Sequence, residues 1–289
     1  YCAAITKSLT QQNTKTRIAY TPLHGVAMRL IQKSFTKAQA GELIPVKTQM
    51  VPDADFPTVS FPNPEEHGVM DSVIDLAKAS NADLALANDP DGDRLAVAIP
   101  TLSGDWRLLS GDEIGALLFN HVARKTSGNN RKVVTTIVCS KLVSKIASNH
   151  GVEHATTLTG FKWIIPAAYN DSSLQPIFCY EEALGYATNT AVRDKDGISA
   201  ALMMAELTAA LKEQGQTLED ELEALSLEYG HHVTKTWRVR FNSDKSSNVI
   251  PKVMQHLRAN PLSTVNQMKV LEVKDYLLQD NETGLPSTD

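Results

Sequence analysis

The stretch Leu84-Ala85-Leu86-Ala87-Asn88-Asp89-Pro90-Asp91-Gly92-Asp93-Arg94-Leu95-Ala96-Val97-Ala98-Ile99 predicts two apolar strands joined by an acidic loop. Asp89, Asp91 and Asp93 alternate in this loop, so their carboxylates can converge on one hard cation. Like charges crowded into a loop raise one another's pKa, and a divalent ion is the simplest partner that makes the arrangement favourable. Oxygen ligands alone indicate Mg²⁺, Mn²⁺ or Ca²⁺ and not zinc.

An EF-hand is one alternative, because its loop also begins with acids at the first, third and fifth positions. An EF-hand loop needs Gly at its sixth position and Glu at its twelfth, and here these positions hold Arg94 and Pro100. Three Asp leave coordination sites open for water or a phosphate oxygen, as catalytic Mg²⁺ sites do. Arg94 beside the acids suits an anionic ligand. The remaining alternative is a solvated turn in which Asp is the usual filler.

Strand and helix patterns alternate on both sides of this loop, which predicts an α/β fold. The expected strands are 17–20, 43–47, 83–87, 95–99, 133–139, 154–158 and 176–180. The expected helices are 26–38, 65–79, 112–124, 141–149, a short helix between the Lys162 loop and the strand at 176, 198–211 and 218–229. A strand at 234–241, a helix at 246–259 and a strand at 268–273 follow. We expect two similar α/β domains with mixed, largely parallel sheets at 1–108 and 109–230, then the start of a truncated α+β domain at 231–289. In such sheets, loops at the carboxyl ends of strands carry the ligands.

The composition is ordinary for a globular protein and excludes two classes of partner. Of the 289 residues 42% are apolar and 21% are charged, and the formal net charge is -5. This charge gives no basic stripe for nucleic acid, and no apolar run approaches the ~18 residues of a membrane span. Three cysteines without a CxxC spacing favour a reducing cytoplasm over a disulfide framework.

The acidic loop, residues 88–94, resembles the metal-binding loop of the alpha-D-phosphohexomutases, the phosphoglucomutase and phosphomannomutase superfamily. Residues 157–163 (Thr-Leu-Thr-Gly-Phe-Lys-Trp) are similar to its Thr-Gly-aromatic-Lys loop. Residues 180–186 (Tyr-Glu-Glu-Ala-Leu-Gly-Tyr) are similar to its sugar-recognition loop, and residues 194–197 (Asp-Lys-Asp-Gly) to the segment that follows. The order and spacing of all four also fit, so the resemblance covers nearly the whole chain from about Arg17 onward.

The resemblance implies a domain assignment and a set of site residues. The three segments would be domain II with the metal-binding loop, domain III with the sugar-binding loop, and part of domain IV. Mg²⁺ would be the cofactor, and the substrates would be a sugar phosphate and a sugar bisphosphate. The implied metal ligands are Asp89, Asp91 and Asp93, the catalytic residues Arg94 and Lys162, and the substrate-binding residues Thr159, Gly160, Lys162, Glu181, Ala183 and Lys195.

Simpler roles remain open for two of these residues. Lys162 follows Thr159 and Gly160 at a helix start, where free backbone N–H groups favour a phosphate, but it could be a surface lysine. Lys195 could belong to a charge-balanced helix start capped by Asp196. Glu181 and Glu182 face opposite ways if this segment is extended, so only one of them need reach the sugar.

The sequences of three segments are most similar to the phosphopentomutase and glucose-1,6-bisphosphate synthase branch of the superfamily. These segments are 56–66, 158–163 and 181–183. Where many relatives carry a serine this chain has Ala183, and where some carry a histidine it has Tyr186. Because of these two departures, the sugar can be a hexose or a pentose. The activity can likewise be that of a mutase or of a bisphosphate synthase.

The family's phosphoserine loop and its C-terminal phosphate clamp do not occur in this sequence, which suggests an internal fragment of a mutase. The resemblance implies that the intact protein transfers a phosphoryl group between the 1- and 6-positions of a hexose phosphate, through a bisphosphate and an upstream phosphoserine. The fragment alone should be inactive. A Mg²⁺-dependent phosphatase fits less well, because its nucleophilic Asp should follow the first strand, where Tyr20-Thr21-Pro22 stands. A non-catalytic protein that binds metal or sugar phosphate is the alternative of another class.

Overall fold

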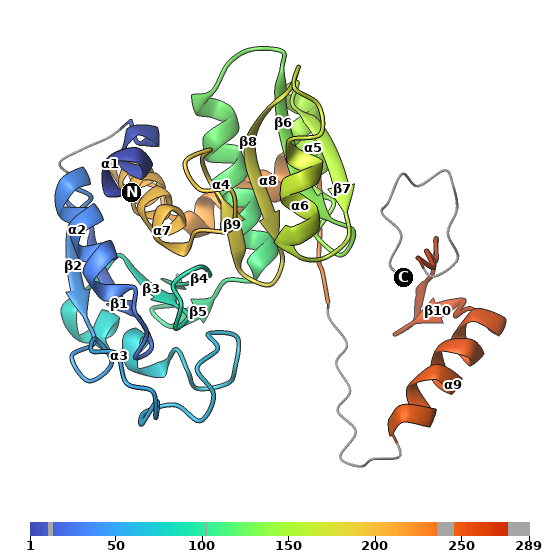
Figure 1. Cartoon of the computed structure of the whole chain (residues 1–289), viewed down its shortest axis with the longest axis horizontal. Coiled ribbons are helices and arrows are strands. Elements are labelled where there is room, and N and C mark those ends of the chain that lie inside the picture. Colours follow the sequence, from blue (N-terminus) through green and yellow to red (C-terminus); the bar gives the residue numbers. More distant parts are fainter. Residues whose placement is uncertain (11–13, 102, 236–245, 277–289) are drawn as a thin grey trace. The chain divides into compact units, whose positions relative to one another are not determined.

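The computed structural model describes residues 1–10, 14–101, 103–235 and 246–276. The chain forms two compact units, Tyr1–Thr234 and Lys235–Asp289 (Figure 1). Within the described residues, no helix combines the length and apolar character needed to cross a membrane.

A five-stranded mixed sheet carries the acidic loop. Its strands lie in the order β2-β1-β3-β4-β5. They are β1 (Arg17–Thr21), β2 (Glu42–Pro45), β3 (Leu84–Asn88), β4 (Leu95–Pro100) and β5 (Trp106–Leu108). The strand β1 pairs in parallel with β2 and β3, whereas β3–β4 and β4–β5 are antiparallel. All five residues of β3 are buried, as expected for a strand that is covered on both faces.

A second mixed sheet follows in the chain, in the order β7-β6-β8-β9. Its strands are β6 (Arg131–Thr136), β7 (Glu153–Thr157), β8 (Gln175–Glu181) and β9 (Gly185–Ala187). The strand β6 is parallel to β7 and β8, and β9 returns antiparallel to β8. Both sheets therefore confirm the predicted α/β class with mixed pairing.

Helices connect and cover the strands. Two of them belong to the first sheet, α2 (Met28–Ala38) and α3 (Asp71–Ser80), and the N-terminus adds α1 (Cys2–Ile5) and a 3₁₀ turn (Thr6–Ser8). Three belong to the second sheet, α4 (Gly111–Lys125), α5 (Leu142–Asn149) and α6 (Phe161–Ala168). The capping box at Ser110 and Glu113 explains why α4 begins where it does.

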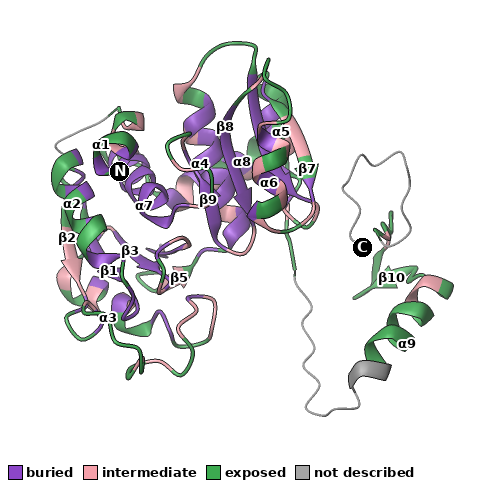
Figure 2. Ribbon diagram, in the orientation of Figure 1, coloured by how far each residue is buried: buried purple, intermediate pink, exposed green. Residues whose placement is uncertain are grey.

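The helix α7 (Gly197–Glu213) lies between the two sheets and joins their cores. It is buried on nearly every side, and it contacts α2, β3 and β4 on one side and α4 and β9 on the other (Figure 2). Its amphipathicity is weak because apolar residues surround it, as is typical of a fully buried helix. One continuous hydrophobic cluster therefore runs through both sheets. The helix α8 (Leu218–Tyr229) is the last helix of this unit.

The second unit contains α9 (Ser246–Ala259) and a short hairpin of β10 (Thr264–Val265) and β11 (Met268–Lys269). The helix has the predicted bounds. The predicted strand 268–273 is wrong beyond Lys269, and the predicted strand 234–241 lies almost wholly outside the described residues. A truncated α+β domain at 231–289 stays a prediction, as does the boundary at 108/109.

Two further predictions of secondary structure need correction. The helix expected at 65–79 begins only at Asp71, because turns occupy the preceding residues and Gly68 has a φ of +81°. The strand expected at 133–139 ends at Thr136. Five short elements were not predicted, since two to four residues are too few to show a period: α1, the 3₁₀ turn, β5, β9 and β10.

Candidate active site

The acidic loop, here named the metal loop (residues 88–94), leads from the end of β3 into β4. Asp89, Asp91 and Asp93 each offer a carboxylate oxygen within 4.8 Å of the other two, so they could hold a metal ion. Asp89 is buried and Asp91 is exposed, which leaves the triad open on one side. Gly92 permits the turn with a φ of +79°, and its N–H donates to the carbonyl of Asp89 at 2.9 Å.

The strand–turn–helix unit that begins with β1 supports the metal loop from beneath. The N–H of Val26 donates to the carbonyl of Pro90 at 2.8 Å. Gly25 lies so close that a Cβ there would be 2.2 Å from the same oxygen. The glycine is therefore required by close approach of the two backbones. His24, which sits in this turn, is buried and its Nε2 lies 2.8 Å from Thr58 Oγ1.

Basic side chains compensate the negative charge of the loop. Arg94 donates from its backbone N to Asp89 Oδ1 at 2.9 Å and from Nε to Oδ2 at 2.6 Å. Lys195 places Nζ 2.6 Å from Asp93 Oδ2. Burial raises the pKa of Asp93, the bond and charge of Lys195 oppose this shift, and the charges of Asp89 and Asp91 add to it. Burial alone would lower the pKa of Lys195, but Asp93 raises it.

The donor set fits a divalent cation. All three side chains of the triad are carboxylates, and each carboxylate oxygen that accepts a hydrogen bond from Arg94 or Lys195 still has a lone pair for a metal. Hard oxygen donors in partial coordination suit Mg²⁺, which keeps part of its shell for water or a phosphate.

Glu181 lies at the end of β8, at the start of the segment named here the sugar loop (residues 181–186). It is 8% exposed. Burial raises the pKa of Glu181, whereas Lys195 and a hydrogen bond with the backbone of Gly160 oppose this shift. Glu182 turns the other way and accepts from Thr136 Oγ1 at 3.1 Å, as predicted for neighbours in an extended segment.

Backbone pairing holds the metal loop and the sugar loop together. Arg94 and Gly185 form an antiparallel bridge, and the N–H of Leu95 donates to the carbonyl of Leu184 at 3.0 Å. A Cβ on Gly185 would lie 2.9 Å from Glu181 Oε1 and 3.0 Å from Lys195 Cδ. The glycine thus allows both side chains to cross the strand. No local pattern in the sequence predicts this bridge, because its partners are far apart in the chain.

The Thr-Gly-aromatic-Lys segment opens α6. Gly160 is the N-cap residue, with a φ of +112°. Thr159 and Lys162 are exposed, and Lys162 Nζ lies 5.6 Å from the centroid of the Trp163 ring. Gly160 connects this segment to the sugar loop through its hydrogen bond with Glu181.

Lys195 and Ala183 complete the predicted set. Asp196 accepts from the backbone N of Ile198 and of Ser199, so the predicted cap of α7 is confirmed. Lys195 also pairs with Asp93 of the metal loop, so its contacts extend beyond the start of α7. Ala183 is half-buried within the sugar loop.

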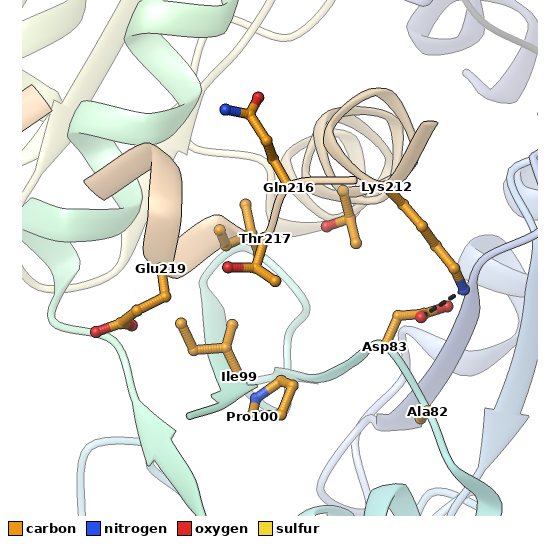
Figure 3. A pocket seen from close by; sticks show the side chains of 10 residues that line it. Ala82, Asp83, Ile99, Pro100, Lys212, Gln216, Thr217 and Glu219 are labelled. Atoms are coloured by element: carbon orange, nitrogen blue, oxygen red, sulfur yellow. Dashed lines mark hydrogen bonds and ion pairs between the residues drawn. The ribbon is translucent and has the colours of Figure 1, made fainter. Parts of the chain in front are cut away.

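Figure 3 shows a separate pocket beside Ala82 and Asp83. These residues precede β3, whereas the metal loop follows it. The pocket is lined by residues that include Asp83, Ile99, Lys212 and Glu219, and Lys212 Nζ pairs with Asp83 Oδ1 at 2.6 Å. None of the predicted site residues lines it. This pocket therefore plays no part in the candidate site.

The fold and the site define an α/β protein in which three carboxylates that could hold a divalent cation lie beside a buried glutamate. Residues 1–104 match phosphoglucomutase/phosphomannomutase alpha/beta/alpha domain II, and residues 110–229 match alpha/beta/alpha domain III. The chain belongs to the phosphoglucomutase/phosphomannomutase family, which confirms the resemblance drawn from its loops.

Curated relatives of this chain are named for different sugar substrates. A Haemophilus influenzae protein named "Probable phosphomannomutase" is 39% identical over 92% of this chain and 53% of its own length. Human phosphopentomutase is 40% identical over 78% of this chain and 38% of its own length. The chain thus spans about half the length of the curated relatives it matches, or less.

Solved structures share the fold. Paramecium phosphoglucomutase (pp63/parafusin) has a TM-score of 0.62 at 20% identity, over 89% of this chain and 44% of that chain. An Aspergillus fumigatus N-acetylphosphoglucosamine mutase, in complex with GlcNAc-6P and magnesium, has a TM-score of 0.55 at 16% identity, over 78% of this chain and 52% of that chain. At these identities the likeness concerns the fold alone.

Proposed function

We propose that this chain is the metal-binding and sugar-binding part of a phosphosugar mutase. The mutase transfers a phosphoryl group between the 1- and 6-positions of a hexose phosphate, through a bisphosphate intermediate and a phosphoserine upstream of this segment. One observation carries the proposal: Lys195 pairs with Asp93 of the metal loop while its stem lies against Gly185 of the sugar loop. The proposed cation site and the proposed sugar ligand therefore face one space.

The side chains of this space suit phosphoryl transfer, in which negative charge spreads over the equatorial oxygens. Mg²⁺ bound to the three Asp would supply the charge that neutralises those oxygens. Arg94, held rigidly by two hydrogen bonds to Asp89, adds positive potential that needs no reorganisation during the reaction. Lys195 adds a second positive charge.

Glu181 and Lys162 are assigned to the substrate. A carboxylate accepts hydrogen bonds from two neighbouring hydroxyls, so Glu181 can hold the sugar in either of its two orientations. Lys162, exposed at the first turn of α6, would contact the phosphate of a sugar held by Glu181, and Thr159 and Gly160 would contribute at the same helix start. Ala183 would line the sugar face of the loop.

A pentose phosphate is the second candidate substrate, because human phosphopentomutase is 40% identical to this chain. A glucose-1,6-bisphosphate synthase would use the same metal loop and sugar loop. The three activities differ in the sugar or in the phosphoryl donor and not in the cation chemistry, so an assay must offer each substrate separately.

The test is a coupled mutase assay on the full-length gene product, with Mg²⁺ and a bisphosphate activator. Glucose, mannose and ribose 1-phosphates are offered in turn. We expect one sugar to turn over and Asp91→Asn to lower kcat by at least about 100-fold, since even partners outside the ligand set often cost 10–100-fold. Asp75→Asn, an exposed carboxylate on α3, is the matched control and should leave kcat unchanged.

Other outcomes separate the alternatives. Synthesis of a bisphosphate without isomerisation would favour the synthase. Absence of any turnover, with cation and sugar phosphate still binding, would replace the mutase proposal with a binding protein. The 289-residue chain alone should bind but not turn over, because the proposed phosphoserine lies outside it.

A further inference from the structure

Two buried polar side chains lie beneath the metal loop and belong to no predicted ligand set. Tyr20 stands in β1, Asn88 ends the adjacent strand β3, and both are 0% exposed. The Tyr20 hydroxyl donates to Asn88 Oδ1 at 2.9 Å. Because this bond occupies the amide oxygen, it directs the Asn88 nitrogen away from Tyr20 and toward the loop.

Asn88 closes the metal loop on itself. Its Nδ2 donates to the carbonyl of Arg94 at 2.6 Å, so a side chain joins the first and last residues of the loop. Gly197, at the start of α7, packs against this closure: a Cβ there would lie 2.3 Å from Arg94 O and 2.4 Å from Asn88 Nδ2. In so closely packed a place the amide has little room to turn elsewhere.

The closure leads directly to a carboxylate of the triad. Asn88 donates to the carbonyl of Arg94. Arg94 in turn donates from its backbone N and from Nε to the two carboxylate oxygens of Asp89. A continuous series of hydrogen bonds thus runs from the Tyr20 hydroxyl to Asp89. Mg²⁺ demands near-ideal octahedral geometry at short distances, whereas Ca²⁺ accepts a looser and more variable shell.

We propose that Tyr20 is a positioning residue for the metal loop, and that it acts through Asn88 to hold the geometry that Mg²⁺ requires. The inference rests on the proposed function, in which this loop binds the cation. Tyr20 touches neither cation nor substrate. Its hydroxyl fixes Asn88, Asn88 fixes the carbonyl of Arg94, and Arg94 fixes Asp89.

The test compares Tyr20→Phe with wild type in calorimetric titrations of the 289-residue chain with Mg²⁺ and with Ca²⁺. Tyr20→Phe should weaken Mg²⁺ binding by about tenfold, within the range found for groups that orient metal ligands. Ca²⁺ binding should weaken less, so the ratio of the two affinities shifts toward Ca²⁺. Tyr180→Phe is the matched control, because Tyr180 is also 0% exposed and donates to Asp112 Oδ1 at 2.8 Å.

The outcomes separate positioning from stability. Tyr180→Phe should lower the melting temperature without changing the ratio of the Mg²⁺ and Ca²⁺ affinities. Unchanged Mg²⁺ binding in Tyr20→Phe would overturn the inference and leave the proposed cation site intact. An equal loss for both cations would also overturn it, since the hydroxyl would then serve general stability. If the wild-type chain binds neither cation, the proposed cation site fails and the inference fails with it.

Discussion

Single residues decide how closely the backbone segments of the site approach one another. Gly25 brings the turn after β1 against Pro90, and Gly185 lets Glu181 and Lys195 cross above the strand. Neither glycine has a positive φ, so each is required for space and not for backbone conformation. A methyl group at either position would have to move part of the site.

Gly25→Ala should displace the metal loop, because the added Cβ would lie 2.2 Å from the carbonyl oxygen of Pro90. We expect a loss of about 2–3 kcal/mol in the free energy of unfolding, typical of overpacking, together with weaker Mg²⁺ binding. Urea unfolding and Mg²⁺ titration measure the two effects. Gly151→Ala is the control: that position is sterically open with a φ of +61°, so it should lose about 1 kcal/mol and keep its Mg²⁺ affinity. Equal affinities in both variants would contradict the prediction.

Lys195→Met should strengthen cation binding and weaken substrate binding. The Lys195 ammonium lies 2.6 Å from Asp93 Oδ2, where it competes with a cation for the same carboxylate. Removing a partly exposed charge should tighten Mg²⁺ binding by about threefold, while KM for the sugar phosphate rises. Titration of the chain and kinetics of the full-length enzyme test the two halves. Lys145→Met, an exposed lysine on α5, should change neither, and weaker Mg²⁺ binding in Lys195→Met would refute the competition.

The residues of the site differ in how far the sequence could predict them. Asp89, Asp91 and Asp93 were found because their spacing within one turn is itself the signal. The pairing of Lys195 with Asp93 joins residues far apart in the chain, and no local pattern encodes it. Asn88 belongs to the motif of the metal loop, but its proposed role depends on a hydrogen bond from Tyr20 in another strand.

At the scale of elements, periodicity predicted most helices and strands, and boundaries failed where turns intervene. The helices α8 and α9 have the predicted bounds because their apolar period is continuous. The helix α3 was predicted six residues too long at its start, since residues 65–70 resemble a helix in composition but form turns. The strand β9 could not be seen in three residues, yet it pairs with β8 and begins at the Gly185 bridge to the metal loop.

The pairing of β6 and β7 predicts a dependence of stability on pH. His154 in β7 lies with Nε2 2.9 Å from Thr135 Oγ1, and burial lowers the pKa of His154 from 6.5. Below about pH 6.5 the unfolded chain therefore binds a proton that the folded chain does not. The free energy of unfolding should consequently fall as the pH decreases below about 6.5. Above this pH the contribution of neutral His154 to the free energy of unfolding is fully present.

Urea unfolding of wild type and His154→Gln at pH 7.5 and pH 5.5 measures this contribution. Wild type should lose more stability between the two values than His154→Gln does, by up to about 1.4 kcal/mol for each unit by which the pKa is lowered. His67→Gln, an exposed histidine in the turns before α3, provides the control. An identical loss in wild type and His154→Gln would show that other groups cause the pH dependence.

At the scale of the whole molecule, the two sheets are not independent of each other. The helix α7 follows the second sheet in the chain but contacts β3, β4 and α2 of the first. Its buried residues belong to the same hydrophobic cluster as both sheets. The shared core consequently fixes the position of the metal loop relative to the sugar loop, in addition to the bridge between Arg94 and Gly185.

This shared core predicts that residues 1–108 will not fold alone, although they contain the complete first sheet and the metal loop. Without α7 the apolar faces of α2, β3 and β4 are exposed to water. Because a unit of this size is only marginally stable, this loss of burial should unfold it. Residues 1–234 should instead unfold in one cooperative transition and bind Mg²⁺. Two-dimensional amide NMR spectra show whether residues 1–108 fold, and scanning calorimetry shows whether residues 1–234 unfold in one transition. A well-dispersed spectrum of 1–108 with wild-type Mg²⁺ affinity would show that the first sheet folds independently and that α7 merely docks upon it.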